Sequence, residues 1–187
     1  MNKAGVIMTI HFTWRITKYN PKYRDEKGIY LRDEWTSVSE IGSITNQDVI
    51  LTIHDYISTE NRYVEAILDM MSCLNIQKLS ISGLEKRENT LDITNFPSLY
   101  SEKMRSLYDQ ATNGLWLEKD QISDISRLIL REKMWCKLKC DSKMYIHFGY
   151  DFYMFIGSEM MCEDTINNIE KSGLYVEDFI SPIKEED

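Results

Sequence analysis

The sequence predicts an α+β fold, with a mostly antiparallel sheet of about five strands packed against about four helices. Two observations lead to this prediction. Three strand patterns follow one another late in the chain, and two helical patterns follow one another before them, so regular alternation of strand and helix is missing. The chain has 187 residues, of which 43% are hydrophobic and only 3 are Pro, so it can bury one sizeable core. We expect a single domain over residues 1–187, with the polar stretch 85–94 as the best candidate for a lobe boundary.

The first half of the chain predicts a strand, an irregular segment and a long helix. Apolar residues alternate from Ile10 to Ile16, and this half-buried strand ends before Pro21. Residues 22–42 are polar, with a turn expected at 25–28 and a short capped turn at 37–40. Thr52 then caps a long helix. Its apolar face is formed by Ile53, Tyr56, Ile57, Val64, Ile67, Leu68, Met71 and Leu74.

The second half predicts a strand, two helices, three strands, a helix and a final strand. Residues 78–84 alternate as a strand, and Pro97 suits the first position of a helix that runs to about Thr112. A further helix is expected over 118–132. The remaining elements are strands at 135–140, 143–148 and 152–156, a helix at about 159–171 and a strand at 174–179. The short loop 149–151 joins two of these strands into a hairpin.

Cysteine is used sparingly, and four residues are too few for a disulfide framework. Cys136 and Cys140 share one face of a predicted strand, with Lys137 and Lys139 on the other. This pattern favours buried thiols behind a solvated lysine face. A zinc site is the alternative, with the candidate ligands Cys136, Cys140, Cys162 and His147. Because no second tightly spaced ligand pair follows, we expect neither a metal nor a cofactor.

Composition and charge limit which partners the protein is expected to bind and where in the cell it is expected to be. No apolar run approaches the ~20 residues that span a membrane. The stretch from Met1 to Ile10 lacks the apolar core and cleavage site of a signal peptide, so a cytoplasmic location is expected. Thirty acidic residues against 22 Lys and Arg give a net charge of −8, which opposes nucleic-acid binding.

The charge is also uneven along the chain. Residues 125–145 carry six basic and two acidic residues, whereas residues 159–187 carry two basic and nine acidic ones. The basic stretch lacks the aromatic signature of RNA-binding proteins, so a nucleic-acid partner is not expected. The acidic end suits a basic protein partner instead.

The predicted hairpin has a second, aromatic face. Parity along its two strands places together Tyr145, His147, Tyr153 and Phe155, with Tyr150 and Asp151 at the loop tip. Three interpretations stay open at this point. A helix covers the face; or the face is an exposed patch that binds a protein; or His147 and Asp151 form the acid–base pair of an enzyme.

A second candidate region is the charged segment 19–41, which carries Trp35. A long polar segment with aromatic residues is typical of a functional loop. The alternative is a surface loop that is held in place by insertion of Trp35 into the core.

Two sets of segments resemble a known group of proteins. They are ITKYNP at 16–21 with Arg24-Asp25, DEWTS at 33–37 and IG at 41–42, and Trp135 with YIHFGYDFYMFIG at 145–157. Together they resemble a group of small, uncharacterised bacterial proteins of similar length. The resemblance implies a compact, stand-alone bacterial protein and carries no activity with it. Small acidic proteins of this kind are often immunity or inhibitor proteins.

These observations favour a protein-binding module over an enzyme, because phosphate-binding loops, zinc-protease motifs and nucleophile elbows are all missing from the sequence. In its most specific form the hypothesis is an immunity-type inhibitor of a basic toxin or effector. Its predicted contact residues are Trp35, Tyr145, His147, Tyr150, Asp151 and Tyr153. The alternative is a small enzyme that uses His147 with Asp151 and neighbouring tyrosines. The sequence makes no prediction of the oligomeric state.

Overall fold

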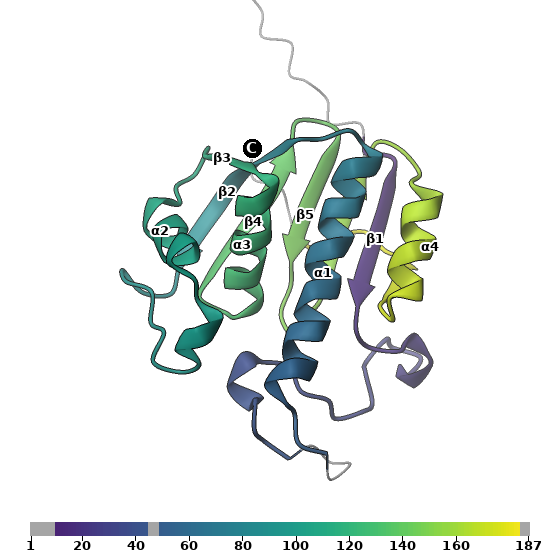
Figure 1. Ribbon diagram of the computed structural model, residues 1–187. Coiled ribbons are helices and arrows are strands. Elements are labelled where there is room, and N and C mark those ends of the chain that lie inside the picture. The colour runs from purple at the N-terminus through teal and green to yellow at the C-terminus, as the bar shows by residue number, and fades with distance from the viewer. Residues whose placement is uncertain (1–9, 45–48, 184–187) are drawn as a thin grey trace, which may run out of the picture.

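The structure is a computed structural model that describes residues 10–44 and 49–183 of the chain. It confirms the α+β class: seven strands form one antiparallel sheet in the order β3-β2-β4-β5-β6-β1-β7, and four α-helices lie on one face of it (Figure 1). Within the described residues the strand count is therefore seven rather than about five. The strands are β1 Phe12–Thr17, β2 Lys78–Lys86, β3 Trp116–Glu118, β4 Met134–Cys140, β5 Met144–Phe148, β6 Met154–Ser158 and β7 Tyr175–Asp178. The helices are α1 Ile53–Cys73, α2 Glu102–Gln110, α3 Lys119–Leu130 and α4 Glu163–Lys171, with short 3-10 turns at Pro21–Tyr23, Val38–Glu40 and Pro97–Leu99.

The long helix α1 begins where the sequence predicts. The Thr52 hydroxyl accepts a hydrogen bond from the Asp55 amide at 3.1 Å, and Asp55 returns the contact, which completes a capping box. The apolar face of α1 packs on the sheet and buries Tyr56, Tyr63, Ile67 and Met70. The predicted capping box of Ser37 and Glu40 is confirmed in the same way.

One buried ion pair joins α1 to the end of α3. Both carboxylate oxygens of Glu60, which is 0% exposed, accept hydrogen bonds from the Arg131 guanidinium, at 2.7 and 2.6 Å. Burial raises the pKa of the Glu60 carboxyl, and the Arg131 hydrogen bonds oppose this shift. Arg127 also lies 3.6 Å from Glu60. Two of the six basic residues in the stretch 125–145 therefore form ion pairs within the fold rather than contribute to a basic surface patch.

Several predicted boundaries are wrong for local reasons. The helix expected from Pro97 is split, because Ser101 caps a new helix through its contact with the Met104 amide at 3.2 Å. The last helix begins at Glu163 rather than about 159, because Ser158 still pairs with strands on both sides. The three-residue strand β3 escaped prediction because it is too short to show alternation.

The cysteines differ most from expectation. Cys73 and Cys162 form a disulfide between the end of α1 and the start of α4, so Cys162 is not a thiol. Cys136 is free and buried, and burial raises the pKa of its thiol to about 12. Lys137 is only 7% exposed, so the expected solvated lysine face is also wrong at this position.

Across residues 10–44 and 49–183, no group of three or more His, Cys, Asp or Glu is placed to hold a metal ion. None of the described helices has the length and apolar character needed to cross a membrane. The features predicted at the two chain ends, before residue 10 and after residue 183, lie outside the described residues.

Candidate functional site

The loop between β5 and β6 is a tight turn with an uncommon backbone. The Tyr153 amide donates a hydrogen bond to the Tyr150 carbonyl at 3.0 Å, and the two residues between them have positive φ angles, 54° at Asp151 and 60° at Phe152. Turns with positive φ at both central residues are common in β-hairpins, but Gly and Asn usually occupy these two positions. Strand β6 therefore starts at Met154 rather than at Phe152 as predicted.

Phe152 is held in this strained conformation by the core. A bulky residue with positive φ is strained, and persists only where its surroundings impose it. Its side chain is 4% exposed and its ring lies 5.0 Å from that of Trp35 and 5.4 Å from that of Tyr63, between centroids. The Tyr63 hydroxyl also donates a hydrogen bond to the Phe152 carbonyl at 2.6 Å. With Phe152 directed inward, Tyr150 is left 91% exposed on a fixed backbone.

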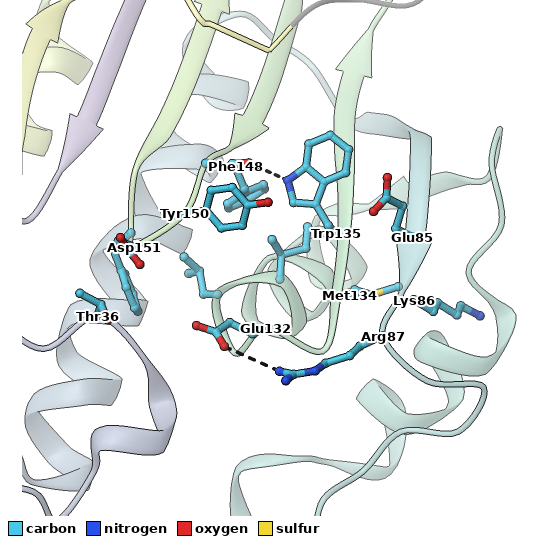
Figure 2. A pocket seen from close by; sticks show the side chains of 14 residues that line it. Thr36, Glu85, Lys86, Arg87, Glu132, Met134, Trp135, Phe148, Tyr150 and Asp151 are labelled. Atoms are coloured by element: carbon cyan, nitrogen blue, oxygen red, sulfur yellow. Dashed lines mark hydrogen bonds and ion pairs between the residues drawn. The ribbon is translucent and has the colours of Figure 1, made fainter.

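Two hollows open beside this turn, and we name them by their walls. The helix-side hollow, of about 440 Å³, lies by the ends of α3 and β2 (Figure 2). The tail-side hollow, of about 840 Å³, is lined in part by Pro182 and Ile183 of the C-terminal segment, residues 179–183. Six residues line both hollows: Glu85, Trp135, Phe148, Gly149, Tyr150 and Asp151.

Trp135, at the start of β4, stands between the two hollows. Its indole Nε1 donates a hydrogen bond to the Phe148 carbonyl at 2.6 Å, which fixes the ring at the mouth of the hairpin. A β-bulge interrupts the pairing of β2 with β4 between Ser82 and Glu85, and after it Glu85 pairs with Trp135. Bulges re-aim side chains and are frequent beside functional sites. In Figure 2 the Trp135 ring stands between Tyr150 and Glu85.

The basic side chains beside the hollows have partners within the protein, whereas two of the acidic side chains have no ion-pair partner among the described residues. Arg87 lies 3.8 Å from Glu132 in an exposed ion pair, and the Lys86 ammonium donates to the Asp109 carbonyl at 3.3 Å. Glu85 and Asp151 are exposed and have no ion-pair partner within the described part of the chain. The shared wall of the two hollows is therefore aromatic and acidic.

The aromatic face predicted for the hairpin is buried. Tyr145, His147 and Phe155 are 8%, 1% and 5% exposed. Their partners include the C-terminal segment rather than a helix: Ser181 Oγ lies 2.8 Å from His147 Nδ1, and the Phe179 ring lies 5.8 Å from that of Phe155. The structure therefore does not place Tyr145 and His147 on an open surface.

Tyr153 and Trp35, two further predicted contact residues, differ in their relation to the hollows. Tyr153 lines the tail-side hollow and accepts a hydrogen bond from Arg24 at 2.8 Å. Trp35 is half-buried beneath Phe152 and lines neither hollow, which matches the interpretation of a loop held by Trp35. Of the six predicted residues, the structure brings Tyr150, Asp151 and Tyr153 to the hollows.

Lys18, the residue after β1, contacts the charged segment that follows it. Its ammonium lies 4.1 Å from the centroid of the Trp35 ring and 3.4 Å from a carboxylate oxygen of Glu34. Burial lowers the pKa of Lys18 to about 8, with Glu34 opposing the shift. This contact supports Trp35, which in turn supports Phe152.

Sequence reasoning missed Trp135 and Glu85, although one signal could have found Trp135. Leu138 pairs with Ile146, so the same antiparallel register carried toward the hairpin loop brings Trp135 level with Gly149. The position of Glu85 depends on the bulge at Gly83, where φ is +61°. Apart from the glycine itself, nothing in the alternating pattern of β2 indicates this bulge.

Comparison of the chain with protein-family models, with curated proteins and with solved structures finds no match to any of them. Functional assignment therefore depends on the geometry of the site at the β5–β6 turn.

Proposed function

We propose that the chain is a protein-binding module whose partner docks on Tyr150 and Trp135 at the β5–β6 turn. The observation that carries the proposal is the exposure of Tyr150, 91%, on a turn whose neighbour Phe152 is 4% exposed. A large aromatic side chain on a pre-formed backbone loses little conformational entropy on binding. Aromatic anchors beside hollows are the usual centres of protein interfaces.

The specific form of the proposal is an immunity-type inhibitor that blocks a basic toxin or effector. It is supported by the net charge of −8 and by the two carboxylates, Glu85 and Asp151, that flank the aromatic anchors. Charge complementarity of this kind speeds association and selects partners.

The geometry does not favour the alternative of an enzyme that uses His147 with Asp151. His147 is 1% exposed and lines neither hollow, whereas Asp151 lies on the exposed turn. A general base must come within hydrogen-bond reach of a substrate, and the described residues leave His147 no open path to one.

A cytoplasmic location is part of the proposal and is opposed by one observation. Disulfides persist mainly in oxidising compartments, and Cys73 is joined to Cys162. Rapid acid quenching of the native host followed by thiol labelling tests the location directly. In the cytoplasm we expect Cys73 and Cys162 to be reduced and labelled, and a fully oxidised pair would place the protein elsewhere.

Site-specific photo-crosslinking tests the binding function. A benzophenone amino acid at position 150 should capture one protein in the native host, and the same residue at position 116 is the matched control, because Trp116 is also exposed, at 47%, but lies on the far edge strand. The captured protein must then form a complex with the purified chain. Equal capture from both positions, or a captured protein that does not bind the purified chain, would refute the proposal.

A further inference from the structure

The tail-side hollow has a lining that suits an organic cation. Five aromatic residues and two carboxylates contribute to its wall, and no Lys or Arg is among the described residues that line it. The aromatic members are Trp135, Phe148, Tyr150, Tyr153 and Phe155. The faces of aromatic rings attract cations, and a neighbouring carboxylate adds a charge-assisted hydrogen bond.

Two separate backbone features bring the carboxylates to this wall. The bulge in β2 pairs Glu85 with Trp135, and the positive φ of Asp151 sets this residue next to Tyr150 at the turn. Both side chains are exposed, so a ligand can reach them without first breaking an internal ion pair. The hollow, at about 840 Å³, is far larger than a metal ion needs and accepts a long side chain.

Basic groups around the hollow are engaged with other carboxylates: Lys18, which interacts electrostatically with Asp151, is paired with Glu34 at 3.4 Å. Arg15 and Arg24 both contact Glu177, at 2.8 and 3.5 Å, and Arg24 donates a hydrogen bond to the Tyr153 hydroxyl with its guanidinium 5.4 Å from the centroid of that ring. Lys137 lies two residues beyond Trp135 on the same strand, but it is 7% exposed and does not line the hollow. The acidic character of the wall is therefore local to the hollow.

Building on the proposed function, we propose that the tail-side hollow receives an arginine side chain of the partner protein, stacked on the aromatic wall and paired with Glu85 and Asp151. Arginine fits better than lysine because its flat guanidinium both stacks on rings and bonds carboxylates in pairs. A protein source fits better than a free metabolite because Tyr150, at 91% exposed, extends the contact surface well beyond the hollow.

The test is an NMR titration with two small probes. N-acetyl-arginine-methylamide and its neutral analogue N-acetyl-citrulline-methylamide are added at low salt to the full chain, and the Trp135 indole N–H signal is followed. That signal is assigned by its loss in Trp135→Phe. We expect saturable binding of the arginine probe in the millimolar range and binding of the citrulline probe at least about tenfold weaker, a difference of ~1.4 kcal/mol.

Charge-neutral variants then locate the cation. Glu85→Gln and Asp151→Asn should each weaken binding of the arginine probe several-fold, and Asn is well suited to the positive φ at 151. Glu65→Gln is the matched control, since Glu65 is an exposed carboxylate on α1 that lines neither hollow, and its loss changes the net charge equally. Equal binding of the two probes, or equal weakening in all three variants, would overturn the proposal.

The NMR titration and the photo-crosslinking experiment can fail independently of each other. If position 150 captures a protein that binds but the arginine probe does not bind at Trp135, the partner docks without an arginine in the hollow and only this inference fails. If the arginine probe binds but position 150 captures no partner, the hollow takes a free cation, and the assignment to a partner side chain is wrong.

Discussion

The hydroxyl of Tyr63, in the middle of α1, donates a hydrogen bond of 2.6 Å to the carbonyl oxygen of Phe152 in the β5–β6 turn. This contact ties the turn that presents Tyr150 to the longest helix of the core. It explains how two consecutive residues with positive φ are held beside an exposed aromatic anchor.

Removing that hydroxyl should loosen the turn. Tyr63→Phe leaves a buried carbonyl without its donor, so we expect a loss of about 1–3 kcal/mol in the free energy of unfolding. Hydrogen exchange of the Tyr153 amide, which closes the turn, should also accelerate relative to the core. Tyr56→Phe is the control, because the Tyr56 hydroxyl bonds a different carbonyl, that of Leu130. If both variants affect the Tyr153 amide equally, Tyr63 does not hold the turn.

Tyr145 and Gly157 should be energetically coupled. They are cross-strand partners, and a Cβ added at Gly157 would lie 2.1 Å from the Tyr145 ring. Gly157→Ala should therefore destabilise the protein by about 1–3 kcal/mol in urea unfolding. In a Tyr145→Ala background most of that loss should vanish, because the clash is gone. Additive losses in the double variant would show that the ring does not lie on Gly157.

The Cys73–Cys162 disulfide should contribute to stability. It closes a sequence separation of 89 residues, so its removal should lower the free energy of unfolding by about 2–5 kcal/mol. Urea unfolding with and without reductant measures this. Reductant should destabilise the wild type and leave Cys73→Ser/Cys162→Ser unchanged. A reductant effect of equal size on both proteins would exclude the disulfide as its cause.

Lys18 should make stability depend on pH. Its pKa falls from an ordinary 10.5 to about 8 in the folded protein, so folding releases a proton between these values and the wild type gains stability as the pH rises. Relative to Lys18→Met, the wild type should gain about 2 kcal/mol between pH 7.5 and 9.5. Lys22→Met, at an exposed lysine, is the control for loss of a surface ammonium. A pH-independent difference between wild type and Lys18→Met would contradict the burial of the ammonium.

Local patterns in the sequence predicted much of the fold. Strand parity placed Ile146 and His147 on opposite faces correctly, and Thr52 as a helix cap marked the start of α1, because both depend on neighbouring residues alone. The site depends on contacts between distant segments. Ser181 covers His147 from 34 residues away in the sequence, and the disulfide joins cysteines that are 89 residues apart. Neither contact can be predicted from the residues next to it in the sequence. The positive φ of Phe152 opposes the backbone preference of a bulky residue and follows only from the packing around it.

The central claim is that Tyr150 anchors a protein partner, and the affinity of the purified partner tests it most directly. Isothermal titration should compare the wild type, Tyr150→Ala and Trp116→Ala, two exposed aromatic positions at opposite parts of the sheet. Loss of a central aromatic anchor removes about 2 kcal/mol or more, so Tyr150→Ala should raise the Kd roughly 30-fold or more while Trp116→Ala leaves it unchanged. An unchanged Kd for Tyr150→Ala would contradict the claim.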